Sequence, residues 1–171
     1  MTQNLIKKKY IDVTIDYLKN AIPNSHTIVN SYFYISNDNI YIVDGTKKVI
    51  LDYSDKELEI AIWIETIIGG EFYMNPKVNI PDGIKTADYW WNGEYWDLKM
   101  PIGSSRRTIE NMIKDSKEQS KNFIIDISNS KLTINEAKYQ IKNIYNNAAR
   151  KWINKIILKK GSKLIAIYKR K

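Results

Sequence analysis

The sequence predicts an α+β fold, in which helices flank a mixed β-sheet. Three observations lead to this prediction. From Ser54 onward, helical and β-rich runs follow in the order helix, three strands, helix, strand, helix and two strands. Phe123–Ile127 is almost wholly apolar, as expected of a strand that is buried on both faces. Asn92-Gly93 separates two β-rich runs, which is the strongest short signal for a hairpin.

Residues 1–53 differ from the rest of the chain. Leu5–Asn20 has the apolar spacing of a helix, and Ile22–Ser25 breaks it. Three short β-rich runs separated by turns follow and predict a small β-meander: Thr27–Ile35, Ile40–Val43 and Lys48–Leu51. We therefore divide the chain into residues 1–53, to which the sequence assigns no role, and residues 54–171, which we expect to form the functional domain.

The predicted helices of the second part have clear beginnings. Ser54-Asp55-Lys56-Glu57 is a capping box, and the helix that it opens ends near Ile68 at Gly69-Gly70. This helix is apolar over most of its surface, so we expect it to be buried between layers. Glu65 lies on its apolar side, where a carboxylate must be paired, protonated or bound to something. Four further elements are expected in this part: a polar helix from Thr108 to Lys121, a helix from Thr133 to Ala149, and closing strands Trp152–Leu158 and Leu164–Tyr168.

Composition narrows the classes of function. The absence of cysteine excludes disulfides and thiolate metal sites and fits a reducing, intracellular compartment. No apolar run reaches the roughly 18 residues of a membrane span, and the N-terminus has no secretory pattern. Residues 101–171 carry 17 Lys/Arg against 5 Asp/Glu, whereas residues 1–100 carry 10 against 14. This basic half suggests a phosphate-rich partner, although a charged surface that only aids solubility explains it equally well.

The predicted hairpin carries the candidate chemistry. If Asn92-Gly93 is a two-residue loop, Asp88 lies opposite Asp97, and both share one open face with Lys99. Facing like charges destabilise a hairpin, and a divalent cation, with Mg²⁺ expected, would compensate for them. Such a cation activates water, and an ammonium stabilises developing negative charge, so the set predicts phosphodiester cleavage. Glu65 is the candidate third metal ligand. The alternative is a solvated patch in which Lys99 satisfies both acids.

The segments around this hairpin offer groups for nucleic acid. A Gly-Ser loop leads into a helix N-terminus and presents N–H groups and hydroxyls to an anion, and Arg106 adds a fork of donors. Trp90 and Tyr95 share the carboxylate face and can stack on bases. An ordinary helix cap and core packing are the alternatives. The candidate nucleic-acid contacts are Lys85, Thr86, Trp90, Tyr95, Ser104, Ser105, Arg106, Thr108 and Gln119, the last of which is placed three turns along the helix from Thr108.

Several stretches in this order resemble a known family: Gly83–Asp88, Tyr95–Lys99, Gly103–Ser105 with Thr108-Ile109, Gln119-Ser120 and Asn122–Ile127. They resemble the toxin nuclease domains at the C-terminus of CdiA-type contact-dependent growth inhibition proteins, with similar segments in phage head-morphogenesis proteins and mobile elements. The resemblance implies tRNase activity in the bacterial cytoplasm, an inhibiting immunity protein, and functional roles near Asp88, Asp97 and Lys99.

The catalytic scheme has two alternatives at this point. Asp88 and Asp97-x-Lys99 resemble the core of the PD-(D/E)xK nucleases, which implies a metal. Other inhibition toxins belong to the barnase/EndoU/colicin/RelE-like (BECR) group, which needs none. In that scheme the reaction would depend on Lys85, Thr86, Lys99, Ser105 and Thr108. A DNA endonuclease and a non-enzymatic nucleic-acid-binding phage or mobile-element module are further alternatives. His26 is the sole histidine, so mechanisms that need a histidine pair lack a partner.

Overall fold

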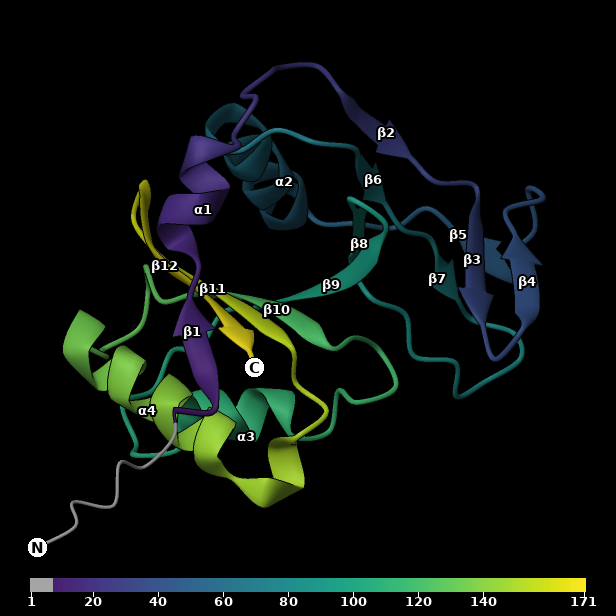
Figure 1. Cartoon of the computed structure of the whole chain (residues 1–171). Helices are drawn as coiled ribbons and strands as arrows, with labels where there is room; N and C mark the ends of the chain where they lie inside the picture. The colour runs from purple at the N-terminus through teal and green to yellow at the C-terminus, as the bar shows by residue number, and fades with distance from the viewer. Residues whose placement is uncertain (1–7) are drawn as a thin grey trace, which may run out of the picture.

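The computed structural model describes residues 8–171 (Figure 1). Its centre is an eight-stranded mixed sheet in the order β1-β12-β11-β10-β9-β8-β6-β2. Strand β10 runs parallel to β9 and β11, and β2 runs parallel to β6, whereas the other neighbours are antiparallel. The strands are β1 Tyr10–Asp12, β2 Ile28–Asn30, β6 Phe72–Met74, β8 Tyr89–Trp91, β9 Glu94–Lys99, β10 Asn122–Asp126, β11 Lys155–Lys160 and β12 Lys163–Arg170.

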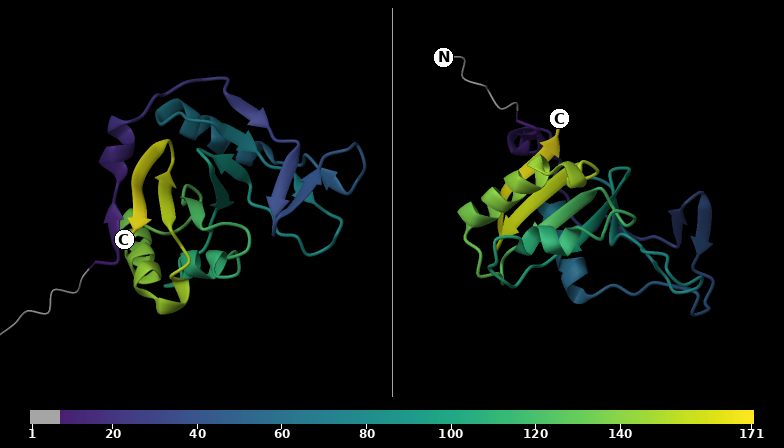
Figure 2. Two further views of the ribbon diagram at one scale, coloured as in Figure 1. Left: turned by 45° about the vertical axis from the view of Figure 1, so that its right-hand side comes forward. Right: turned by 90° about the horizontal axis from the view of Figure 1, so that it is seen from below.

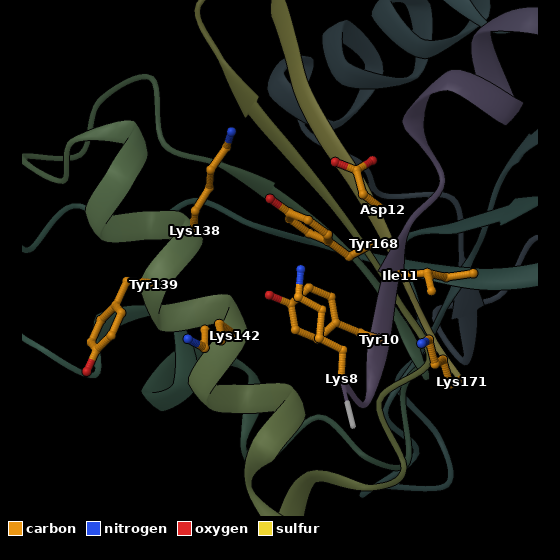
Figure 3. A pocket seen from close by; sticks show the side chains of 9 residues that line it. All are labelled: Lys8, Tyr10, Ile11, Asp12, Lys138, Tyr139, Lys142, Tyr168 and Lys171. Atoms are coloured by element: carbon orange, nitrogen blue, oxygen red, sulfur yellow. The ribbon is translucent and has the colours of Figure 1, made fainter. Parts of the chain in front are cut away.

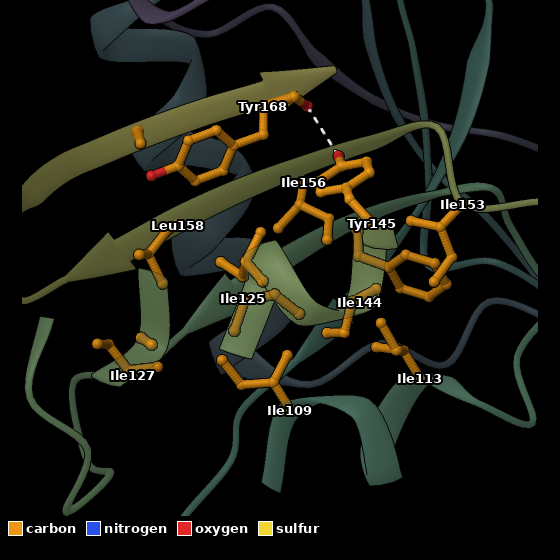
Figure 4. Packing of buried hydrophobic residues seen from close by; sticks show 14 of the residues in the cluster. Ile109, Ile113, Ile125, Ile127, Ile144, Tyr145, Ile153, Ile156, Leu158 and Tyr168 are labelled. Carbon is orange, nitrogen blue, oxygen red and sulfur yellow. Dashed lines mark hydrogen bonds between the residues drawn. The ribbon is translucent and has the colours of Figure 1, made fainter. Parts of the chain in front are cut away.

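Helices cover both faces of this sheet, which confirms the predicted α+β class. Helices α1 (Thr14–Lys19) and α2 (Asp55–Ile67) lie on one face, and α3 (Thr108–Ile113) and α4 (Ile134–Asn146) lie on the other (Figures 1 and 2). The core on the α2 side includes Ile60, Ile64, Trp91, Trp96 and Ile124. The core on the α3–α4 side includes Ile109, Phe123, Ile125, Ile141 and Ile156 (Figure 4). No helix within residues 8–171 is long and apolar enough to cross a bilayer.

Helix α2 begins and ends as the sequence predicts. Ser54 and Glu57 form both hydrogen bonds of the capping box, and Gly69 has a φ of +81° just beyond the helix. A Cβ atom at Gly69 would lie 1.9 Å from the carbonyl oxygen of Ile22, so only glycine fits there. The expected burial of this helix between layers is wrong, because Ile62 is 47% exposed.

The predicted helix over Leu5–Asn20 is largely wrong. Within the described residues, Tyr10–Asp12 is strand β1, and the helix is confined to Thr14–Lys19, while residues 5–7 lie outside the described part. Strand β1 pairs with the C-terminal strand β12, and the ring of Tyr10 stacks on Tyr145 with 4.9 Å between centroids. These contacts with distant residues outweigh the local helical spacing.

The predicted meander forms only in part. Strands β3 (Phe33–Ser36) and β4 (Asn39–Ile42) make a hairpin whose turn is Asn37-Asp38, both with positive φ. Strand β2, however, joins the main sheet beside β6, and β5 (Val49–Ile50) pairs with β7 (Lys77–Val78). The reason is packing, since Val49 is buried against Val78 and Tyr34. The boundary at residue 53 stays a prediction.

Helix α3 is shorter than expected. It ends at Ile113 instead of Lys121, and the chain continues in turns up to β10. The hydroxyl of Ser120 donates to carbonyl oxygens outside the helix, including that of Tyr95 at 2.7 Å. Such side-chain hydrogen bonds compete with helical ones and favour turns. Gln119 therefore lies in a turn and not on the helix of Thr108, which corrects its predicted position.

Candidate active site

The hairpin β8–β9 forms as the sequence predicts. Asn92 and Gly93 have φ values of +48° and +81°, and Trp91 pairs with Glu94 across the turn. The pairing continues through Tyr89 opposite Trp96. Asp88 directly precedes β8, and its Oδ2 accepts the backbone N–H of Leu98 at 2.8 Å. This hydrogen bond holds the Asp88 carboxyl against the strand that carries Asp97.

Asp97 and Lys99 form an ion pair on one face of β9, as expected. Lys99 Nζ lies 2.6 Å from Asp97 Oδ2, an oxygen that accepts no well-aligned hydrogen bond from the described residues. Asp97 is only 2% exposed, whereas the side chain of Lys99 is 18% exposed. The expectation of an open face is therefore wrong for Asp97. Lys99 is the more exposed partner of the pair.

Asp88 is the most strongly perturbed carboxyl of this site. Burial raises its pKa to about 9, and repulsion from Asp97 and a hydrogen bond with Glu57 act in the same direction. The N–H donated by Leu98 opposes this shift. Without a bound cation, Asp88 is therefore protonated at neutral pH and donates to Glu57. A carboxyl with such a pKa can give or take a proton near neutrality.

Glu57, at the beginning of α2, is the third carboxyl of the cluster. Although burial alone would raise its pKa, hydrogen bonds from Asp88 and from Ser54 lower it. One Glu57 oxygen caps the helix through the backbone N–H of Ser54, and the other lies 3.7 Å from Lys77 Nζ. The same side chain thus both closes the capping box and reaches the hairpin.

Glu65, the expected third ligand, lies elsewhere. It follows Glu57 by eight residues of helix, which is about 12 Å along the axis. Its carboxylate is buried and lies 3.4 Å from the backbone N–H of Thr27, and it lines a groove between α2 and the segment around β2. The structure does not bring Glu65 to Asp88 and Asp97.

Tyr34, from the small β3–β4 hairpin, covers this site. Its hydroxyl accepts the backbone N–H of Ala87 at 2.9 Å, and its ring stacks on Tyr95 with 4.8 Å between centroids. Burial raises the pKa of Tyr34, and the nearby carboxyls of Asp97 and Asp88 add to the shift. The phenol is therefore neutral at the edge of the carboxyl cluster.

Three of the predicted nucleic-acid contacts line one groove of about 350 Å³: Trp90, Tyr95 and Gln119. Lys117 and Lys121 line the same groove, together with the carboxylates of Glu94 and Glu118, so it has no surplus of positive charge. Gln119 also donates to the carbonyl oxygen of Thr86 at 3.2 Å, and Lys85 donates to the carbonyl oxygen of Asp115 at 3.2 Å. The segment before β8 and the turns after α3 are thereby held together.

The loop before α3 is fixed by Gln140 of α4. The amide nitrogen of Gln140 donates to the carbonyl oxygen of Ser105 at 2.8 Å, and its oxygen accepts the N–H of Ile109 at 3.0 Å. The hydroxyls of Ser105 and Thr108 lie 2.9 Å apart, while Ser104 and Arg106 are exposed. The Ile109 N–H already has a partner, and the Thr108 hydroxyl donates to the Ser105 carbonyl oxygen, whereas the side chains of Ser104 and Arg106 remain exposed to an anion.

The paired carboxyls of Asp88 and Asp97 fit a divalent cation in their charge. Asp88 and Asp97 form a partly desolvated pair in which one member needs a proton, and a cation could take the place of that proton. Among residues 8–171, however, no three histidine or acidic side chains converge as a ready metal site.

Sequence reasoning missed Glu57 and Tyr34. The capping box accounts for Glu57 so completely that nothing in the sequence shows its second contact with Asp88. Tyr34 lies more than fifty residues before the hairpin, in a segment with no motif. For Glu57, the sequence does show a carboxylate in the first turn of the helix that precedes the strands. This position could have marked it as a candidate, although it does not indicate which group it contacts.

Comparisons with known proteins agree with this fold. A solved structure, the CdiA-CT/CdiI toxin and immunity complex from Burkholderia pseudomallei, has a similar fold. The TM-score is 0.50 and the identity 21%, over 65% of this chain and 80% of that chain. No curated protein matches the sequence. Residues 85–164, which include the hairpin site, match the family described as the contact-dependent growth inhibition CdiA C-terminal domain. This part of the chain therefore belongs to the CdiA C-terminal toxin family.

Proposed function

We propose that this toxin domain is a nuclease that cleaves RNA, with tRNA as its substrate. The observation that carries the proposal is the Asp97–Lys99 ion pair beside the protonated Asp88, at the end of one hairpin. The basic second half of the chain, with 17 Lys/Arg against 5 Asp/Glu, supports a polyanionic substrate.

In the proposed reaction, Lys99 positions the attacking water and stabilises the negative charge that develops on the phosphate oxygens. Asp97 holds the Lys99 ammonium in place through the 2.6 Å ion pair. Without a cation, Asp88, with its raised pKa, can deliver its proton to the leaving oxygen, as the metal-independent scheme would use it; if Asp88 holds a cation it is ionised, and that proton comes from water. Glu57 accepts the hydrogen bond from Asp88 and thereby orients this carboxyl.

A divalent cation is the proposed cofactor, with Asp88 and Asp97 as the residues that would hold it. When bound, it would lower the pKa of a water ligand and neutralise developing charge. The metal-independent alternative on the same hairpin depends on Lys85, Thr86, Lys99, Ser105 and Thr108, and chelation separates the two schemes.

We further propose that a cognate immunity protein blocks this domain and that it acts in the cytoplasm of a target bacterium. The similar solved structure is itself a complex of a toxin with an immunity protein. The proposed substrate is found in the cytoplasm, so cleavage of tRNA would take place there.

The test is incubation of the purified protein with total bacterial RNA, with Mg²⁺ or with EDTA, followed by sequencing of the cut ends. We expect tRNA fragments with Mg²⁺ and none with EDTA. Cleavage that persists in EDTA would contradict the metal scheme and favour the metal-independent one. Nicking of plasmid DNA without RNA cleavage would contradict the RNA assignment.

A further inference from the structure

A basic groove, of about 520 Å³, lies between strands β1 and β12 on one side and helix α4 on the other (Figure 3). Four lysines line it: Lys8, Lys138, Lys142 and Lys171. The carboxylate that lines the groove is that of Asp12, which already accepts hydrogen bonds from the backbone and the hydroxyl of Thr14. The groove therefore has a surplus of positive charge.

The lysines of this groove are available for an external anion. Lys138 and Lys142 are one helical turn apart and project from the same side of α4. Within residues 8–171, none of the four ammonium groups lies within 4.0 Å of a carboxylate oxygen, whereas eight ion pairs join other residues. Cations that are gathered without internal partners are typical of phosphate-binding surfaces.

Three tyrosines complete the groove. Burial, with the nearby Asp12 carboxylate, raises the pKa of Tyr168 to about 12 and also raises that of Tyr10. Both phenols therefore remain protonated, and neither hydroxyl donates to another described residue, so both can donate to a phosphate oxygen. The ring of Tyr139 is 63% exposed on α4 and can stack on a base.

The groove and the candidate active site belong to the same face of the sheet. Tyr168 is in register with Ile156, Ile156 with Phe123, and Phe123 with Asp97, so these four residues form one row across β12, β11, β10 and β9. Three of them pack under α3 and α4. Three strand spacings correspond to about 14 Å between Tyr168 and Asp97. A ligand that occupies both places must pass over the α3–α4 layer.

We propose that this basic groove is a second RNA-binding site, which holds the phosphate backbone of a folded RNA while the hairpin site cleaves it elsewhere. The proposal rests on the proposed function, since it concerns the same substrate. A short single strand can fill the hairpin site alone, whereas a folded RNA can contact both places. The groove thus makes the enzyme selective for folded RNA.

The first test measures binding of total bacterial tRNA in an Asp97→Asn background, which we expect to bind without cleaving. Lys138→Glu with Lys142→Glu should weaken binding by about tenfold or more at physiological ionic strength. The plot of log affinity against log salt concentration should become shallower, with the magnitude of its slope reduced by about 2, because two phosphate contacts are lost. The matched control, Lys19→Glu with Lys163→Glu, makes the same charge change at exposed positions outside the groove and should weaken binding by less than about threefold.

The second test measures cleavage with Asp97 intact. The groove variant should raise KM for tRNA without changing kcat, and should cut a short single strand of the cleaved sequence as fast as the unmodified protein. Equal effects of the groove and control variants, or unchanged tRNA binding, would overturn the proposal. So would a loss confined to binding of anionic phospholipid vesicles, which would assign the groove to a membrane surface. If the unmodified protein cleaves no RNA but tRNA binding still depends on Lys138, the proposed function fails and the binding site remains.

Discussion

Leu98 donates its backbone N–H to Asp88 at 2.8 Å, and this bond places Asp88 beside the strand that carries Asp97. The consequence is a desolvated carboxyl between two others, since Asp97 repels Asp88 and Glu57 accepts a hydrogen bond from it. An arrangement selected only for stability would avoid such a cluster. Departures of this kind are expected where a structure serves a chemical purpose.

Asp88→Asn should make the protein more stable at alkaline pH. The folded state holds a proton on Asp88 up to pH of about 9, whereas the unfolded chain releases it near pH 4. Between these values the folded state binds the extra proton, so the free energy of unfolding falls as pH rises. Asparagine keeps an acceptor for Leu98 and a donor for Glu57. Because it does not titrate, it avoids this loss of stability as pH rises. We expect a higher Tm at pH 8, by about 2–4 °C for each kcal/mol gained, and a flatter pH profile.

Glu57 does not disturb this pH window. Its pKa is lowered, so the stability that it contributes is present above the usual glutamate pKa of about 4.3 and is lost only below it. The prediction for Asp88→Asn is checked by thermal unfolding of this variant and of the unmodified protein from pH 5 to pH 9. If the two Tm profiles run parallel over this range, Asp88 does not hold the extra proton.

Glu57→Gln should reduce RNA cleavage by about tenfold or more, because a neutral amide orients Asp88 less firmly. Glu65→Gln is the matched control on the same helix and should change cleavage by less than about twofold. Ser54→Ala removes the cap but keeps the carboxylate, so it separates loss of helix stability, about 1 kcal/mol, from loss of activity. Greater inactivation by Glu65→Gln than by Glu57→Gln would show that the wrong carboxylate has been assigned.

Tyr34→Phe should destabilise the fold by about 1–2 kcal/mol, because it leaves the buried N–H of Ala87 without its acceptor. The stacking on Tyr95 is retained, so the effect isolates the hydroxyl. Urea denaturation measures the change, with Tyr139→Phe, an exposed tyrosine on α4, as the control. Equal stability of the two variants would mean that Tyr34 does not secure the segment before β8.

Gln140→Leu should loosen the loop before α3. It removes the acceptor of the buried Ile109 N–H and the donor to the Ser105 carbonyl, which should cost about 1–3 kcal/mol. Amide hydrogen exchange should increase at Ile109 more than at Phe123, which lies in the sheet beneath. A uniform increase at both amides would indicate general unfolding and not release of the loop.

Local signals predicted the elements that depend on local chemistry. The turn at Asn92-Gly93 requires left-handed backbone, and the capping box at Ser54 pairs two neighbouring residues, so both could be read from short stretches. The register of the hairpin followed, and with it the shared face of Asp97 and Lys99.

Elements that depend on distant partners could not be predicted in this way. Tyr10 is in a strand because β12 provides a hydrogen-bonding edge for it. Strand β5 pairs with β7, which is distant in the sequence, and not with the strands that precede it. The place of Glu57 depends on the angle at which α2 crosses the sheet. For the same reason the periodicity of α2 indicated Glu65 as buried but not which groups would surround it.

The most direct test of the proposed site is the rate of tRNA cleavage by Asp97→Asn relative to the unmodified protein, with both shown to be folded by thermal unfolding. Loss of the carboxylate frees Lys99 from its 2.6 Å partner, and we expect the rate to fall by about 10²-fold or more with the Tm preserved or raised. Cleavage at the unmodified rate by folded Asp97→Asn would contradict the assignment of the hairpin as the catalytic site.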